Sequence, residues 1–101
     1  MTATQSERAQ PLILVVEDEE SLRLTIEYNL RQQGYRVTGT GRGDEAVRIA
    51  ARDKPDLVIL DLMLPGLDGI QVCRTLRRRS PARIILLTAL AGEADRVTGL
   101  D

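Results

Sequence analysis

The sequence predicts an α/β protein built on a doubly wound parallel sheet, and two features carry this prediction. Three short aliphatic runs, at residues 12–16, 57–60 and 84–87, have the length and composition of strands buried on both faces, as in a parallel sheet. Segments with helical periodicity separate the runs. Strands that alternate with helices in this way require right-handed crossovers and place helices on both faces of the sheet.

The N-terminal half is expected to hold two strands and the helix between them. A disordered lead at 1–10 precedes a strand at 12–17. In the following helix, at 20–33, apolar residues recur at i, i+4 and i+8, which predicts one buried stripe. These residues are Leu22, Ile26 and Leu30. Gly34 is a natural C-cap, and a second strand is expected at 35–40.

The next helix is expected to begin at 43–44, with Asp44 as its N-cap and four small apolar residues on one face. These residues are Ala46, Val47, Ala50 and Ala51. Pro55 ends this helix before a strand at 57–61.

A loop at 62–69, rich in turn residues, leads to a helix at 70–79. That helix is expected to bury Ile70, Cys73 and Leu76. A fourth strand follows at 83–88, and a last helix begins near Gly92.

Three of the predicted strands end in polar residues: Glu17 and Asp18 after the first, Asp61 after the third and Thr88 after the fourth. Ligands of open parallel sheets bind outside the carboxyl ends of the strands. Bringing the acids of the first and third strands together requires these strands to be neighbours. The expected strand order is therefore 2-1-3-4, which is flavodoxin-like.

The composition excludes several function classes. The chain has 101 residues and no histidine, which removes Ser-His and Cys-His catalysis and most zinc chemistry. A net charge of -1 argues against nucleic-acid binding driven by bulk charge. The sequence shows no signal peptide and no apolar stretch of membrane-spanning length, and the lone Cys73 fits a reducing compartment. We therefore expect a cytoplasmic domain without membrane or direct nucleic-acid contact.

Carboxylates that meet at one edge repel one another unless they are protonated or share a cation. Magnesium is the natural occupant, because it prefers oxygen ligands and binds through one or two carboxylates together with phosphate oxygens. Such a site recruits a phosphoryl group and leaves a carboxylate free to attack phosphorus, which forms an acyl phosphate.

Residues 15–19, 60–69 and 87–89 resemble the three signature segments of two-component response-regulator receiver domains. The resemblance covers the chain after its lead, so 11–101 is expected to form the receiver domain. Residues 61–69 and 95–101 are similar to receivers that precede a winged-helix DNA-binding domain.

The resemblance implies a role for each candidate site residue. Asp61 would be the phosphoacceptor, Asp18 a direct Mg²⁺ ligand, and Glu17 would act mainly through a bound water. The backbone carbonyl of Met63 would complete the protein ligands. Thr88 would hydrogen-bond the phosphoryl oxygen and move when it arrives, which makes it the switch.

The resemblance also implies a partner and an output. A sensor histidine kinase would donate the phosphoryl group, and the output would be the control of transcription. The chain would be no enzyme beyond accepting and losing this group.

One family feature has no counterpart in the sequence. Receivers carry a lysine at the end of a fifth strand, and the sequence ends before such a strand, so we expect a receiver that lacks the fifth strand and the last helix. Lys54 cannot replace that lysine, because it precedes the third strand and a five-residue strand spans about 16 Å.

Two functions therefore stay open. The first is a magnesium-dependent phosphoryl-accepting switch. The second is an interaction module that is not phosphorylated and self-associates, as a homodimer or larger assembly, through its exposed sheet edge. A carboxylate-using phosphatase is weaker, because no acid lies two residues after Asp61.

Overall fold

The computed structural model describes residues 10–61 and 69–87, which form four parallel strands and three helices. In chain order these are β1 (Leu12–Val16), α2 (Glu20–Gln32), β2 (Arg36–Thr40), α3 (Gly43–Asp53), β3 (Leu57–Asp61), α4 (Gly69–Arg79) and β4 (Arg83–Leu87). The strand order is β2-β1-β3-β4 and every neighbouring pair is parallel. The predicted fold class and strand order are therefore confirmed.

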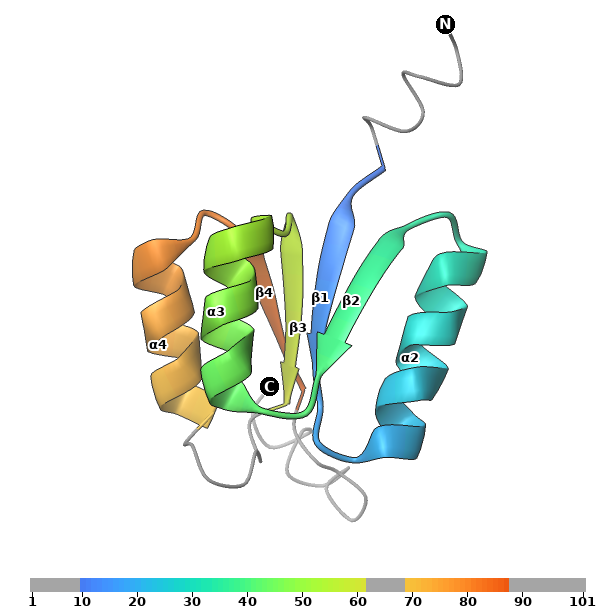
Figure 1. The fold of residues 1–101 in the computed structure, drawn as a ribbon, viewed down its shortest axis with the longest axis horizontal. Coiled ribbons are helices and arrows are strands. Elements are labelled where there is room, and N and C mark those ends of the chain that lie inside the picture. Colours follow the sequence, from blue (N-terminus) through green and yellow to red (C-terminus); the bar gives the residue numbers. More distant parts are fainter. Residues whose placement is uncertain (1–9, 62–68, 88–101) are drawn as a thin grey trace, which may run out of the picture.

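The sheet lies between two helical layers. In Figure 1, α3 and α4 cover one face and α2 lies on the other. All four strands run toward the same edge, and α2 begins at this edge because it directly follows β1. The carboxyl ends of the two central strands, β1 and β3, therefore come together beside the start of α2.

The hydrophobic core lies between the sheet and the α3–α4 layer. Its ten residues are all at most 8% exposed: Leu14, Val16, Ala46, Ile49, Ala50, Val58, Leu60, Val72, Cys73 and Leu76. The strand members are two residues apart in each strand, because alternate side chains of a strand point to the same face. We call this the closed face of the sheet.

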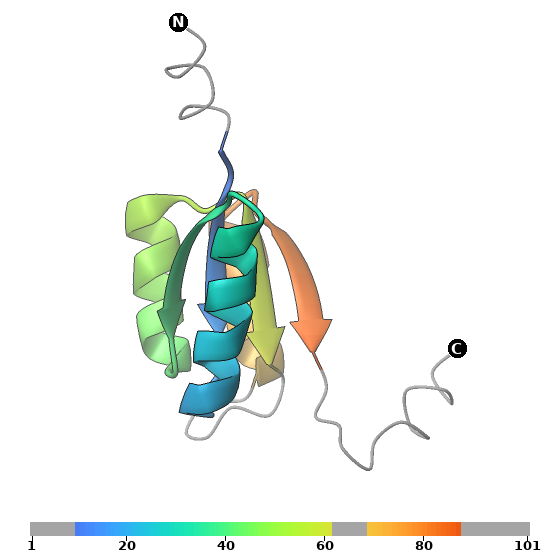
Figure 2. The ribbon, with the colours of Figure 1, turned by 90° about the vertical axis from the view of Figure 1, so that its right-hand side faces the viewer.

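The other face is only partly covered by the described residues. Helix α2 packs against β2 and β1, whereas β4 stands clear of it (Figure 2). Leu57 and Ile59 of β3 are half-buried, and the side chain of Ile85 in β4 is 49% exposed. These residues line an open groove of about 690 Å³ together with Leu30 of α2. We call this the open face.

Two burial predictions for the open face are wrong. The fourth strand was expected to be buried on both faces, yet none of the five residues of β4 is buried, because β3 is its only partner among the described strands. The apolar stripe of α2 is not buried either: Leu22 is 44% exposed, and the rest of the stripe is half-buried. Leu30 of this stripe lines the open groove, and the buried residue of α2 is instead Glu27.

Two details of α3 also differ from the prediction. The helix begins at Gly43 after Arg42, and Asp44 lies in its first turn rather than at the N-cap. Asp44 accepts a hydrogen bond from the Glu45 N–H (2.9 Å) and forms an ion pair with Arg42 (2.9 Å), so its carboxylate serves local contacts. On the core side, Ile49 is buried and Ala51 is exposed, because Ile49 and Ala46 are three residues apart on one helix face.

In α4, Cys73 and Leu76 are buried as predicted, but Ile70 is 49% exposed and Val72 takes the buried position. Ile70 precedes Val72 by two residues, which places the two side chains on opposite sides of the helix. Gly34 has a φ of 95° just after α2, which confirms its role in ending the helix.

Several expectations fall outside the described residues. They are the disordered lead, the loop after β3 with Met63, the strand-end residue Thr88 and the last helix. Within the ranges that the structure describes, no helix is long and apolar enough to cross a membrane.

Candidate metal site

The candidate site lies at the carboxyl ends of β1 and β3. These strands are neighbours, and their register pairs Val16 with Leu60. The next residue in each strand direction is an acid, Glu17 after β1 and Asp61 at the end of β3. Asp18 follows Glu17 in the short connection to α2. The strand order thus brings together acids that are more than forty residues apart in the sequence.

The three carboxylates form one compact cluster. Each of Glu17, Asp18 and Asp61 offers a carboxylate oxygen, and these oxygens all lie within 4.8 Å of one another. Glu17 is 4% exposed and Asp61 is 7% exposed, whereas Asp18 is exposed. The cluster therefore has two acids set into the fold and one at its open side, from which a ligand can enter.

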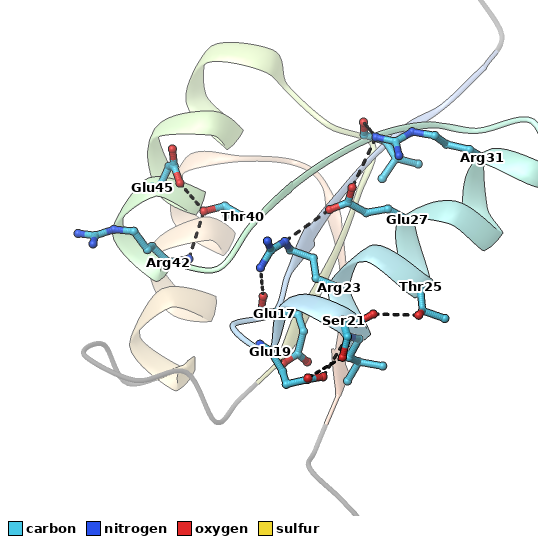
Figure 3. A network of polar contacts seen from close by, with 12 residues as sticks. Glu17, Glu19, Ser21, Arg23, Thr25, Glu27, Arg31, Thr40, Arg42 and Glu45 are labelled. Atoms are coloured by element: carbon cyan, nitrogen blue, oxygen red, sulfur yellow. Dashed lines mark hydrogen bonds and ion pairs between the residues drawn. The ribbon is translucent and has the colours of Figure 1, made fainter.

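Hydrogen bonds fix Glu17 through its backbone and its side chain. Its N–H donates to the Thr40 carbonyl (3.0 Å), and its carbonyl accepts from Nη1 of Arg23 (2.9 Å). Its Oε2 accepts from the Glu19 N–H (3.0 Å). Figure 3 shows Glu17 and Arg23 side by side at the start of α2. Glu17 is therefore held in place by β2, by α2 and by its own loop.

Burial raises the pKa of the Glu17 carboxyl to about 7 from its ordinary value of 4.5. The hydrogen bond from the Glu19 N–H acts in the opposite direction and lowers this pKa. The charge of Asp61, a hydrogen bond to Asp61 and the charge of Asp18 raise it further. Because a third negative charge in the cluster is unfavourable, the cluster favours either a shared proton or a bound cation.

Glu19 lies beside the cluster, but its carboxylate caps α2. Its Oε1 accepts a hydrogen bond from the Leu22 N–H (3.0 Å), and its Oε2 accepts one from the hydroxyl of Ser21 (2.7 Å). Glu19 is the N-cap of α2, so its carboxylate satisfies the first turn of the helix. This explains why Glu19 does not join the cluster, which takes only Glu17 and Asp18 from the run of four consecutive acids after β1.

The end of β2 contributes a buried hydroxyl that sequence reasoning missed. Thr40 is 5% exposed, and its Oγ1 donates to Glu45 of α3 and accepts from the Arg42 N–H (3.1 Å). Its carbonyl binds the Glu17 N–H (3.0 Å). Thr40 thus joins the start of α3 to the candidate site. The sequence did hold a signal for this role, because Thr40 is a polar residue at the end of the second predicted strand.

The structure brings together three of the five predicted site residues. Glu17, Asp18 and Asp61 meet as expected, whereas Met63 and Thr88 lie outside the described residues. Lys54 follows α3 and precedes β3, which places it at the opposite edge of the sheet. The donors of the cluster are all carboxylate oxygens. This set fits a hard cation such as Mg²⁺ better than metals that favour nitrogen or sulfur.

Comparison with known proteins supports the family that the sequence resembles. Residues 13–101 match the family model described as the response regulator receiver domain. The alkaline phosphatase synthesis transcriptional regulatory protein PhoP of Bacillus subtilis is 49% identical over 90 residues. These residues make up 88% of this chain but only 38% of PhoP, so the chain spans well under half of that relative.

Two solved structures are also similar. The receiver domain of sensor histidine kinase PA1611 from Pseudomonas aeruginosa PAO1, with magnesium coordinated in its active site cleft, is 44% identical with a TM-score of 0.73. The match covers 88% of this chain and 75% of that one.

The response regulator TrrA of Thermotoga maritima has been solved in complex with the histidine kinase ThkA. The match to that complex has 37% identity and a TM-score of 0.75 over 81% of this chain and 72% of the other. From the family match, the identity to PhoP and the shared fold, this chain belongs to the response regulator receiver domain family.

Proposed function

We propose that this chain is a phosphoryl-accepting receiver in which the Asp61 carboxylate takes a phosphoryl group from a phosphohistidine of a sensor histidine kinase. The observation that carries the proposal is the cluster of three carboxylate oxygens within 4.8 Å at the ends of β1 and β3. In the reaction an Asp61 oxygen forms a bond to phosphorus, the phosphorus–nitrogen bond breaks, and the histidine leaves. The product is an acyl phosphate on Asp61.

The proposal includes a magnesium ion, which neutralises the charge of the transferring phosphoryl group. Asp18 and Asp61 would bind it directly, Glu17 through a water and Met63 through its carbonyl. The exposed position of Asp18 and the raised pKa of Glu17 support a cation at this edge. So does the magnesium that the PA1611 receiver holds in its active site cleft.

Thr88 completes the proposed switch. Leu87, the last residue of β4, pairs with Asp61 in the β3–β4 register, and Thr88 is the next residue along the chain. This position at the end of the neighbouring strand supports a hydroxyl close to the phosphoryl group. Its hydrogen bond to a phosphoryl oxygen would couple the chemistry at Asp61 to the segment after β4.

The proposed partner reaches Asp61 from the edge where α2 begins. Large apolar side chains on α2 are exposed: Leu22 is 44%, Leu24 50% and Tyr28 62% exposed. Exposed apolar side chains on a helix that begins beside the reaction site favour a protein partner. TrrA, a similar protein, has been solved with a histidine kinase, which supports the same class of partner here.

The proposed output is the control of transcription, because PhoP is named as a transcriptional regulatory protein. A cytoplasmic location and a domain at 11–101 belong to the same proposal. The buried free thiol of Cys73 suits a reducing compartment.

Phosphoryl transfer from a purified sensor histidine kinase or from acetyl phosphate tests the proposal. We expect label on the wild-type protein with Mg²⁺, no label on Asp61→Asn and strongly reduced label on Asp18→Asn. Asp53→Asn is the matched control, because Asp53 lies on α3 and pairs only with Arg52 among the described residues. Equal label on Asp61→Asn, or label that survives removal of the metal, contradicts the proposal.

A second candidate function is self-association without phosphorylation. Its supporting observation is β4, which has one strand partner in the described part of the chain and exposes Ile85 and Leu86 at 49% and 41%. Open strand edges and apolar surfaces favour association. Analytical ultracentrifugation separates the two candidates. A dimer that forms without phosphate and is lost in Ile85→Lys supports self-association, whereas a monomer contradicts it.

A further inference from the structure

Arg23 connects the candidate metal site to the interior of α2. Its guanidinium donates from Nη1 to the Glu17 carbonyl (2.9 Å), and its Nε lies 3.6 Å from Oε2 of Glu27 (Figure 3). The Arg23 side chain is only 19% exposed. One rigid, planar group therefore joins the backbone at the end of β1 to a side chain one helical turn further along α2.

Glu27 is the fixed end of this connection. It is 7% exposed, and arginines one turn before and one turn after it neutralise its charge. Arg31 lies 3.5 Å from Oε1 of Glu27 and also donates to the Val37 carbonyl of β2 (3.3 Å). A buried carboxylate is tolerated only when such partners compensate its lost hydration. Glu27 is therefore held from both sides and can act as an anchor for Arg23.

Two glycines of the β2 segment leave room for this pair. A Cβ at Gly39 would overlap Oε2 of Glu27. A Cβ at Gly41 would lie 3.1 Å from Nη1 of Arg23 and 3.4 Å from the Asp18 Cα. The β2 backbone thus approaches the anchor and the metal-site loop so closely that a larger residue at position 39 would force Glu27 to move.

Asp18 depends on its neighbours for its position. Within residues 10–61 and 69–87, no hydrogen bond or ion pair holds its carboxylate. The peptide that carries Asp18 is instead fixed on its N-terminal side, where the Glu17 N–H binds Thr40 and the Glu17 carbonyl binds Arg23. Of these contacts, the Arg23 hydrogen bond is the one made by a side chain.

We propose that Arg23, anchored by Glu27, is a positioning residue for magnesium: it fixes the Glu17–Asp18 peptide and thereby aims the Asp18 carboxylate. This inference rests on the proposed function, in which Asp18 binds the ion directly. It assigns a role to the buried Glu27 and the half-buried Arg23, which the phosphoryl-transfer chemistry itself does not use.

Charge and position predict opposite effects when Arg23 is replaced. Arg23 carries a positive charge near the site, so its loss would tighten Mg²⁺ binding if electrostatics alone mattered. Loss of a contact that orients a metal ligand weakens binding, by about 10-fold for typical outer-sphere partners. The sign of the change therefore identifies which effect operates.

The experiment is a calorimetric Mg²⁺ titration of wild-type protein, Arg23→Gln and Arg31→Gln. Arg31→Gln is the matched control, because it removes the same charge from the same helix and the same partner, Glu27, without touching Glu17. We expect Mg²⁺ binding to weaken about 10-fold in Arg23→Gln and to change less than about twofold in Arg31→Gln. The amide resonance of Asp18 in metal-free protein should shift only in Arg23→Gln.

Arg23→Lys covers the case in which Arg23→Gln is unstable. It keeps the charge, but an ammonium group cannot donate from one end while it pairs from another. We expect about threefold weaker Mg²⁺ binding in Arg23→Lys, between wild type and the typical loss of an outer-sphere partner.

Unchanged or tighter binding in Arg23→Gln and Arg23→Lys, with wild-type protein that binds Mg²⁺, overturns the positioning role alone. Wild-type protein that binds no Mg²⁺ overturns the proposed function and this inference together.

Discussion

The two faces of the sheet differ in how completely the described residues cover them. On the closed face, Val58 and Leu60 of β3 are fully buried against α3 and α4. On the open face, Leu57 and Ile59 of the same strand are half-buried, and Ile85 of β4 is 49% exposed. Neighbouring residues of one strand therefore lie in different environments. The carboxylate cluster is built on strands that pack against α3 and α4 on the closed face, while its loop is bonded to α2 on the open face.

The stability of the fold depends mainly on the closed face, whereas the geometry of the site depends on contacts of the open face. The closed face supplies most of the buried apolar area, which is the main favourable term in folding. The open face has few buried apolar residues, but it holds the Arg23–Glu27 pair that contacts the Glu17 carbonyl. Variants of the closed face should therefore change stability first, and variants near α2 should change the site first.

The largest expected effect is on the closed face. Leu60→Ala should lower the free energy of unfolding by about 3 kcal/mol, because it leaves a cavity in a fully packed core. Ile59→Ala, one residue away on the open face, should cost only about 1 kcal/mol, because its side chain is only half-buried and little apolar surface is returned to water. Urea denaturation measures both. Equal costs would mean that the open face is covered as well as the closed one.

The next effect is expected at Glu27, where β2 packs closely against a buried, paired carboxylate on the open face. Gly39→Ala should cost about 2 kcal/mol, because the new Cβ displaces Glu27 from its arginines and leaves a buried charge poorly paired. In a Glu27→Ala background the same substitution should cost much less, because the overlapping group is absent. A double-mutant cycle in urea measures this coupling, and additive costs would contradict the contact.

The third effect is a pH dependence centred on the cluster. The pKa of Glu17 is about 7 in the folded protein and 4.5 ordinarily, so between these values the folded protein binds more protons than the unfolded chain. The free energy of unfolding without metal should therefore fall as pH rises from about 4.5 to about 7. Mg²⁺ should raise the melting temperature most above pH 7, where Glu17 is charged.

Asp61→Asn is the control for this pH effect. It removes a like charge from the cluster and should stabilise the metal-free protein by about 1 kcal/mol at pH 8, the interaction of two charges about 4 Å apart in water. Its slope with pH should be shallower than that of wild type. A metal-free wild type whose stability rises from pH 5 to pH 7 would show that the cluster does not repel.

The smallest effect is expected at the exposed side of β4. Ile85→Ser should change the free energy of unfolding by less than about 0.5 kcal/mol, because half of the side chain is already in water. Binding of an apolar dye such as anilinonaphthalene sulfonate should decrease in this variant. A large loss of stability would place Ile85 in a covered environment.

Much of the fold could be predicted because it depends on local patterns. The third strand was expected at 57–61 and lies there, since Pro55 and the following apolar run define its start. The strand order followed from one condition, that Asp61 meets the acids after the first strand, and it is confirmed. The burial of Cys73 and Leu76 followed from helical periodicity.

The rest depends on which surfaces meet in three dimensions. The burial of Glu27 could not be foreseen, because it requires Gly39 of β2 to lie against α2 and two arginines to compensate the charge. The exposure of Ile85 depends on the neighbours of β4 and not on its own residues. At the site, the meeting of Glu17, Asp18 and Asp61 was predictable, whereas the roles of Met63 and Thr88 stay predictions.

The most direct test of the central claim is a calorimetric Mg²⁺ titration of the carboxylate cluster at pH 8. Wild-type protein should bind one ion per chain, Asp18→Asn and Asp61→Asn should lose measurable binding, and Asp53→Asn should bind like wild type. Wild-type protein without heat of binding, or Asp18→Asn with unchanged affinity, would contradict the claim that these three acids form a magnesium site.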